Sequence, residues 1–113
     1  DFVIDVRFLR NPHYDLALRP LTGNDPEVGA FIVADEHFAA FKEHLGQLLL
    51  PLVERCRQQG RRVLTIAVGC TGGKHRSGFV AETLRARFAA QKIQASSHHR
   101  ELTVEGKNQV VEK

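Results

Sequence analysis

The stretch Val63–Ser77, which reads VLTIAVGCTGGKHRS, constrains the fold more than any other part of the chain. It begins with an apolar run over residues 63–68 that is rich in β-branched side chains, a pattern typical of a strand buried in a parallel sheet. At Gly69 the run gives way to glycines and cations, and after Ser77 apolar residues recur at helical spacing. The stretch therefore predicts a strand, a glycine-rich turn and the N-terminus of a helix.

This arrangement favours the binding of an anion. A helix N-terminus presents backbone N–H groups and the positive end of the helix dipole. Lys74 and Arg76 add formal charge, and an arginine fork matches two phosphate oxygens. Ser77 is expected to cap the helix. We therefore expect a phosphate site at the loop, formed by Cys70, Thr71, Gly72, Gly73, Lys74, His75, Arg76 and Ser77.

The loop does not fit the two common nucleotide-binding motifs. The Walker A pattern G-x-x-x-x-G-K-[ST] requires one more residue between Gly69 and Gly73, and a hydroxyl side chain where His75 stands. The dinucleotide pattern G-x-G-x-x-G does not fit the loop either. Neither motif accounts for the glycines of this segment.

Cys70 and Arg76, followed by Ser77, do fit C-x5-R-[ST], the phosphate loop of cysteine-dependent phosphatases. A thiol beside cations at a helix N-terminus is readily deprotonated, which makes Cys70 a candidate nucleophile. Against this, Gly69 stands where that class usually has histidine, and the chain has no Trp to form a tryptophan-proline-aspartate loop. We favour a packing role for Cys70. A third hypothesis is a dimerisation module whose loop binds nothing.

The loop is more specific than a generic glycine motif. Gly69–Ser77, GCTGGKHRS, resembles the signature of the C-terminal domain of the RapZ/YvcJ family of bacterial nucleotide-binding and RNase-adapter proteins. Two further strings agree with the family, DVRFLRNPHY over residues 5–14 and LRPLTG over residues 18–23. His99 and Arg100 match a third family position. The resemblance spans about residues 1–102.

The resemblance implies a regulatory domain without catalytic turnover and without a cofactor. It implies a phosphorylated ligand, an amino-sugar phosphate such as glucosamine-6-phosphate, with His13 and His75 reaching its hydroxyl or amino groups. It also implies binding of small regulatory RNA, recruitment of a ribonuclease, and self-association into a homo-oligomer. The nucleotide-hydrolysing Walker loop of the family belongs to an N-terminal domain that this chain does not contain.

Composition sets the remaining bounds. A chain of 113 residues with 42% hydrophobic and 26% charged residues indicates one globular domain. We expect it to span residues 1–102 and to have been excised from a longer protein, because the chain lacks Met and starts inside an apparent strand. Two cysteines, no signal peptide and no long apolar segment predict a cytoplasmic protein without a disulfide framework or a membrane span. No histidine cluster predicts a metal site.

Taken in order, the chain predicts an α/β fold. We expect strands at residues 2–8, 63–68 and 93–97, and helices at residues 26–34, 35–59 and 77–91, with Pro51 kinking or dividing the second helix. The predicted result is a small three-layer domain with a short, mainly parallel sheet of about three strands, flanked by helices.

Polar residues after the first predicted strand are expected to face the loop, because ligands bind at the carboxyl ends of parallel strands. These residues are Arg7, Asn11 and His13, and Arg100 lies after the third predicted strand. The alternative for Arg7 is an ion pair with an acid such as Asp5, and that for Asn11 is turn chemistry.

Basic residues near the end of the second predicted helix are weaker candidates for RNA contact. Arg55, Arg57, Arg61, Arg62 and, further on, Lys92 are the residues concerned. Stabilisation of the helix C-terminus and solubility are the alternative that we favour. Residues 103–113 are predicted to form a disordered tail. The basic tail of some family members is replaced here by an electrically neutral one, which weakens the case for RNA binding.

Overall fold

The computed structural model describes residues 2–61, 63–71, 74–99 and 107–112. Its strands are β1 (Phe2–Asp5), β2 (Leu64–Gly69), β3 (Ala95–His99) and β4 (Lys107–Glu112). Its helices are α1 (Pro26–Val33), α2 (Phe38–Gln58) and α3 (Arg76–Ala90), and a short 3-10 helix covers Pro12–Tyr14. The α/β class predicted from the sequence is confirmed, and the strand, turn and helix predicted around the loop become β2, the loop and α3.

The strands form one mixed sheet in the order β1-β2-β4-β3. β1 and β2 are parallel, with Phe2 opposite Ile66 and Asp5 opposite Gly69. β4 runs antiparallel to both of its neighbours, β2 and β3. Among the described residues, the sheet therefore has a fourth strand and a single parallel pair, because residues 107–112, which the sequence placed in a disordered tail, pair between β2 and β3.

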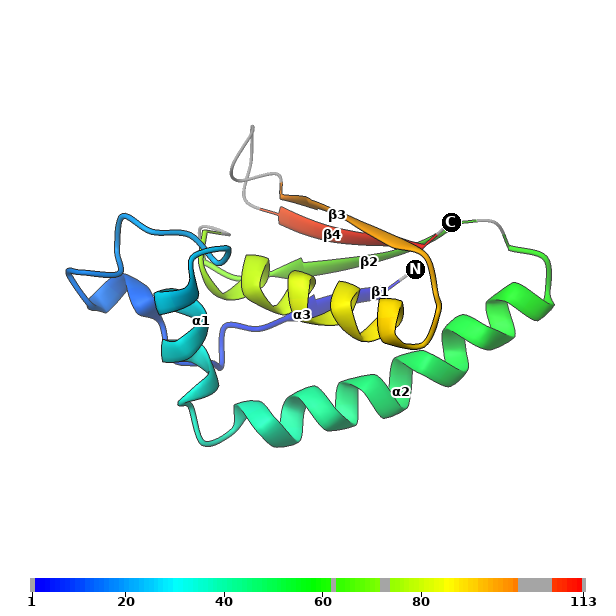
Figure 1. Ribbon diagram of the computed structural model, residues 1–113, viewed down its shortest axis with the longest axis horizontal. Coiled ribbons are helices and arrows are strands. Elements are labelled where there is room, and N and C mark those ends of the chain that lie inside the picture. The colour runs from blue at the N-terminus through cyan, green and yellow to red at the C-terminus, as the bar shows by residue number, and fades with distance from the viewer. Residues whose placement is uncertain (1, 62, 72–73, 100–106, 113) are drawn as a thin grey trace.

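The core lies on one face of the sheet. Ile66 and Val68 of β2 are buried there together with Val6, which follows β1. α3 crosses this face and contributes Leu84 and Phe88 to the core, while α2 runs alongside (Figure 1). On the opposite face Val3 of β1 is 85% exposed. The helices thus cover one face of the sheet rather than forming layers on both sides.

The helix boundaries follow local chemistry. Pro26 occupies the first turn of α1, where a missing N–H costs no hydrogen bond. α2 continues through Pro51 as one helix of 21 residues, so the predicted division there does not occur. Gly60 follows its end with φ +80°, a conformation that glycine adopts without strain.

The corner between α1 and α2 is tied to the end of β1 by a buried carboxylate. Asp35 is 5% exposed, and its oxygens accept hydrogen bonds from the backbone N–H of Arg10 at 2.7 Å and of His37 at 2.9 Å. These bonds hold the pKa of Asp35 below its ordinary value, the bond from His37 having the largest effect. Within the described ranges, none of the helices is long and apolar enough to cross a membrane.

Candidate phosphate-binding loop

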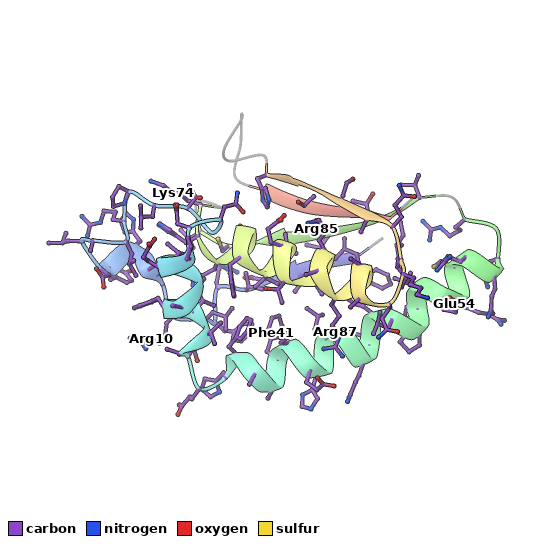
Figure 2. All side chains as sticks on the ribbon, viewed as in Figure 1. Arg10, Phe41, Glu54, Lys74, Arg85 and Arg87 are labelled. Atoms are coloured by element: carbon purple, nitrogen blue, oxygen red, sulfur yellow. The ribbon has the colours of Figure 1, made fainter. Side chains whose placement is uncertain are left out.

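The loop after β2 lies at the carboxyl end of the parallel strand pair. β1 and β2 both end at this edge, because Asp5 pairs with Gly69 and the N–H of Val6 bonds to the carbonyl oxygen of Gly69 at 2.9 Å. α3 then starts at Arg76. This edge is the one that the sequence predicted for a ligand, and Figure 2 shows Lys74 there, between the end of β2 and α3.

Arg76 points into the protein rather than into solvent. It is 4% exposed, and its Nη1 donates hydrogen bonds to the carbonyl oxygens of Arg7 at 2.6 Å and Leu9 at 2.9 Å. Hydrogen bonds from a charged group are stronger than neutral ones, so this contact fixes the chain after β1 against the start of α3. The guanidinium that the sequence placed on a phosphate is therefore engaged, at Nη1, in holding the backbone.

His75 has a similar role towards another segment. It is 5% exposed, and its Nε2 lies 3.1 Å from the carbonyl oxygen of Leu18, an arrangement in which Nε2–H donates. Burial lowers the pKa of His75 below its ordinary value, so the neutral ring is favoured. The loop is thus attached through two adjacent residues to two segments that are distant in sequence.

Gly23 allows the third attachment. Its N–H donates to the carbonyl oxygen of Lys74 at 2.9 Å. A Cβ at this position would overlap the carbonyl oxygen of His75 and the backbone nitrogen of Phe79. The segment around Gly23 therefore lies directly against the first turn of α3, and only glycine fits there without displacing backbone.

Cys70 and Ser77 meet across the loop. The Sγ of Cys70 donates to the Oγ of Ser77 at 3.3 Å, and the backbone N–H of Ser77 donates to the same sulfur at 3.4 Å. Ser77 was predicted to cap the helix, but α3 starts one residue earlier and His75 stands at the N-cap position without a side-chain cap bond. The sulfur of Cys70 thus accepts a hydrogen bond from one backbone N–H group in the first turn of α3.

Two other loop residues lie nearer to solvent. Thr71 is exposed and Lys74 is partly exposed, so both are accessible to a ligand at this edge. Gly72 and Gly73, whose amides the sequence assigned to a phosphate, lie outside the described residues, as does Arg100. The side chains available from the described part of the loop are therefore those of Thr71 and Lys74.

The residues after β1 are near the loop but engaged locally. Arg7 forms an ion pair with Asp5, in which its Nη2 lies 2.6 Å from Oδ2. The Oδ1 of Asn11 accepts the backbone N–H of His13 at 3.0 Å, which is turn chemistry. The His13 ring is exposed, and its carbonyl oxygen accepts a bond from the Nε of Arg19 at 2.8 Å. For Arg7 and Asn11 the structure matches the alternatives that the sequence left open.

Comparison with known proteins shows to which family the chain belongs. The family model described as the RapZ C-terminal domain matches residues 1–103. The chain belongs to this family. It is 47% identical to a nucleotide-binding protein of Granulibacter bethesdensis, and the match covers 92% of the chain and 32% of that protein. It is 48% identical to a nucleotide-binding protein of Paramagnetospirillum magneticum, and the match covers 94% of the chain and 35% of that protein. A nucleotide-binding protein of Rhodospirillum rubrum is 49% identical, and the match covers 90% of the chain and 32% of that protein. The chain spans about a third of each of these relatives.

The candidate RNA-binding cations of this RapZ C-terminal domain lie away from the loop. Arg55, Arg57 and Arg61 are exposed around the end of α2, close to where β2 begins, whereas the loop follows the other end of β2 (Figure 1). Arg57 lies 3.8 Å from Glu54 in a surface ion pair. Lys92 follows α3 and is exposed, and Arg62 lies outside the described residues. The two predicted sites are therefore at opposite ends of the sheet.

One polar cluster of this RapZ C-terminal domain was not predicted. The carboxylate of Glu82, on α3, accepts hydrogen bonds from the Oγ of Ser97, from the Nε of Arg85 at 3.1 Å and from His99, whose Nε2 lies 3.0 Å away. Burial raises the pKa of Glu82, but the bonds from Ser97, His99 and Arg85 outweigh burial and lower it. No local pattern indicates this cluster, because β3 residues reach Glu82 only after α3 has packed on the sheet.

Proposed function

We propose that this domain binds a phosphorylated small molecule at the Cys70–Ser77 loop and does not turn it over. The observation that carries the proposal is the position of the loop, at the carboxyl ends of β1 and β2 and at the N-terminus of α3, with Lys74 accessible at its open side. Anions bind at such helix N-termini because the N–H groups and the dipole favour negative charge. Membership of the RapZ C-terminal domain family supports the same site.

In this proposal the loop residues have two different roles. Thr71 and Lys74, with the backbone N–H groups around the helix start, bind the phosphate. His75 and Arg76 hold the loop in shape through Leu18, Arg7 and Leu9. The exposed His13 is available to the non-phosphate part of the ligand. From the resemblance, we propose an amino-sugar phosphate such as glucosamine-6-phosphate as that ligand.

We further propose that the domain binds small regulatory RNA and acts as part of an RNase adapter that self-associates. Support comes from family membership and from the exposed Arg55 and Arg61 near the end of α2. Because these cations lie at the opposite end of the sheet from the loop, RNA and the small molecule would occupy separate surfaces. Phosphate contacts of this kind weaken steeply with salt, so the salt dependence of RNA binding should fall in an Arg55→Ala variant.

The competing proposal is a cysteine-dependent phosphatase. One observation favours it, namely that Cys70 lies at the start of α3, where its sulfur accepts a hydrogen bond from the backbone N–H of Ser77. Against it, such an enzyme needs an arginine on the phosphoryl group. Here the Nη1 of Arg76 is bonded to the carbonyl oxygens of Arg7 and Leu9. We therefore favour binding without turnover.

The decisive experiment is calorimetric titration with glucosamine-6-phosphate, inorganic phosphate and ATP. Saturable binding of the sugar phosphate to the wild type, weakened in Lys74→Ala and unchanged in Lys42→Ala, would support the proposal. Lys42 is the matched control because it is an exposed lysine on α2, away from the loop. Absence of binding by all three compounds would contradict it, and release of inorganic phosphate that stops in Cys70→Ser would favour the phosphatase.

A further inference from the structure

Asp25 stands at the N-cap position of α1 but does not cap the helix. Aspartate is favoured at this position because its carboxylate can accept a backbone N–H group from the first turn. The side chain of Asp25 makes no such bond. Its Oδ2 instead accepts the backbone N–H of Thr22 at 2.7 Å, and the hydroxyl of Thr22 donates to the same oxygen at 3.4 Å. The carboxylate therefore closes the turn before α1 rather than the end of the helix.

The turn over residues 22–25 is held by two further hydrogen bonds. The N–H of Asn24 donates to the Oγ1 of Thr22 at 3.2 Å. The N–H of Asp25 donates to the carbonyl oxygen of Thr22 at 3.0 Å. Side-chain oxygens that accept nearby backbone N–H groups give a turn a defined shape. The side chains of Thr22 and Asp25 therefore set the direction of the backbone at Gly23, which lies between them.

Gly23 connects this turn to the loop. Its N–H donates to the carbonyl oxygen of Lys74 at 2.9 Å, and a Cβ on Gly23 would overlap the carbonyl oxygen of His75. Figure 1 shows the start of α1 beside the start of α3. The peptide that joins Lys74 to His75 is trans, so its N–H points away from its carbonyl group. The hydrogen bond from Gly23 thus directs the N–H of His75 to the side opposite Gly23.

We propose that Asp25 is a positioning residue for the anion site of the loop. It acts through Thr22 and Gly23 and orients the peptide that follows Lys74, so that the N–H of this peptide faces a bound phosphate. This N–H belongs to His75, the N-cap residue of α3. A helix N-terminus binds anions through backbone N–H groups, and a hydrogen bond weakens steeply when its donor is misdirected. The inference rests on the function proposed for the loop.

The missing cap bond on α1 supports this role. A capping side chain stabilises its helix, and Asp25 gives up that bond to hold the turn that contacts the loop. Proteins depart from such local rules chiefly at functional or strained sites. The departure therefore favours a function for the turn beyond starting α1.

The test is an NMR titration of the isotope-labelled protein with inorganic phosphate. Asp25→Ala should weaken phosphate binding by about tenfold, the size expected when one hydrogen bond to a charged group is lost. Asp25→Asn should bind nearly as well as the wild type, because its amide oxygen can still accept the N–H of Thr22. Glu27→Ala is the matched control and should leave binding unchanged, since Glu27 is an exposed carboxylate of the first turn of α1.

A second readout separates positioning from a general loss of stability. Without phosphate, the amide of Gly23 should exchange with solvent faster in Asp25→Ala than in Glu27→Ala, because the turn no longer holds it against Lys74. Thr22→Val keeps the shape of the side chain but removes the hydroxyl that accepts the N–H of Asn24. It should weaken phosphate binding in the same direction, which provides a test that does not depend on the folding of Asp25→Ala.

The outcomes distinguish this inference from the function on which it rests. Equal phosphate binding by Asp25→Ala and the wild type would overturn the inference and leave the function proposed for the loop standing. An equal loss of binding in Asp25→Ala, Asp25→Asn and Glu27→Ala would also overturn it, because lost charge or stability would then explain the effect. Absence of saturable shifts in the wild type would overturn the proposed function, and the inference with it.

Discussion

The guanidinium of Arg76 donates a hydrogen bond to the carbonyl oxygen of Leu9, a residue 67 positions earlier in the chain. The same Nη1 also bonds to the carbonyl oxygen of Arg7. The first residue of α3 therefore determines where the chain runs after β1. In this domain Arg76 therefore holds the backbone after β1 in place and also adds a positive charge beside the loop.

Replacement of Arg76 should destabilise the domain. Arg76→Ala leaves two carbonyl oxygens without their donor, and an unsatisfied buried polar group costs about 1–3 kcal/mol. Arg76→Lys should restore only part of the loss, because an ammonium lacks the planar fork. Urea unfolding measures both, with Arg55→Ala, at an exposed position on α2, as the control expected within about 0.5 kcal/mol of wild type. Wild-type stability of Arg76→Ala would contradict the backbone-holding role.

The buried His75 should make stability depend on pH. Its pKa is lowered in the folded state, so the unfolded chain binds the proton more readily. The contribution of the neutral ring is complete above the ordinary value of 6.5 and is lost progressively as the pH falls below it. The unfolding free energies of wild type and His75→Gln should therefore be measured at pH 7.5 and 5.5. The change to pH 5.5 should destabilise the wild type more than it destabilises His75→Gln. A difference that does not change with pH would show that His75 does not titrate on unfolding.

Gly23 and Gly69 should respond differently to alanine. Gly23→Ala places a methyl group against the backbone of His75 and Phe79, and overpacking of this kind costs about 1–3 kcal/mol. Gly69→Ala meets no atom within 4 Å and should be tolerated. Because Gly23 lies against the loop, its variant should also bind the phosphorylated ligand more weakly. Thermal unfolding and calorimetry measure the two effects, and equal behaviour of both variants would contradict the close packing at Gly23.

Loss of the Glu82 carboxylate should loosen β3. Glu82→Gln keeps the shape of the side chain but removes the charge that accepts bonds from Ser97, His99 and Arg85. Amide hydrogen exchange of residues 95–99 should become faster, and the domain should lose about 1–3 kcal/mol. The wild type should lose the same contribution as the pH falls below the ordinary Glu value of 4.5, because the pKa of Glu82 is lowered in the folded state. Unchanged exchange in β3 would indicate that the cluster does not hold this strand.

The parts that the sequence predicted correctly are those set by local pattern. The apolar run before Gly69 and the helical spacing after Ser77 place β2 and α3, and Gly60 marks the end of α2. The position of the loop at the edge where β1 also ends follows from the parallel pairing of these strands.

The parts that it missed depend on contacts between distant segments. Nothing near His75 and Arg76 indicates that both point inward, because their acceptors lie 57 to 69 residues away. The pattern of residues 107–112 likewise does not predict a strand, because the place of this segment in the sheet is set by its pairing with β2 and β3 on either side. The charge of Arg76 alone therefore does not reveal that its Nη1 is bonded to the backbone.

The position of β4 also affects how the chain folds as it is made. Among the strands that the structure describes, β4 comes last in sequence but lies second from the edge, so β3 lacks this partner until residues 107–112 have left the ribosome. Until then the sheet consists of the β1–β2 pair, and α3 covers a surface that is only partly formed. Because non-local pairing of this kind closes late, the domain should complete its folding after synthesis of its final strand rather than segment by segment.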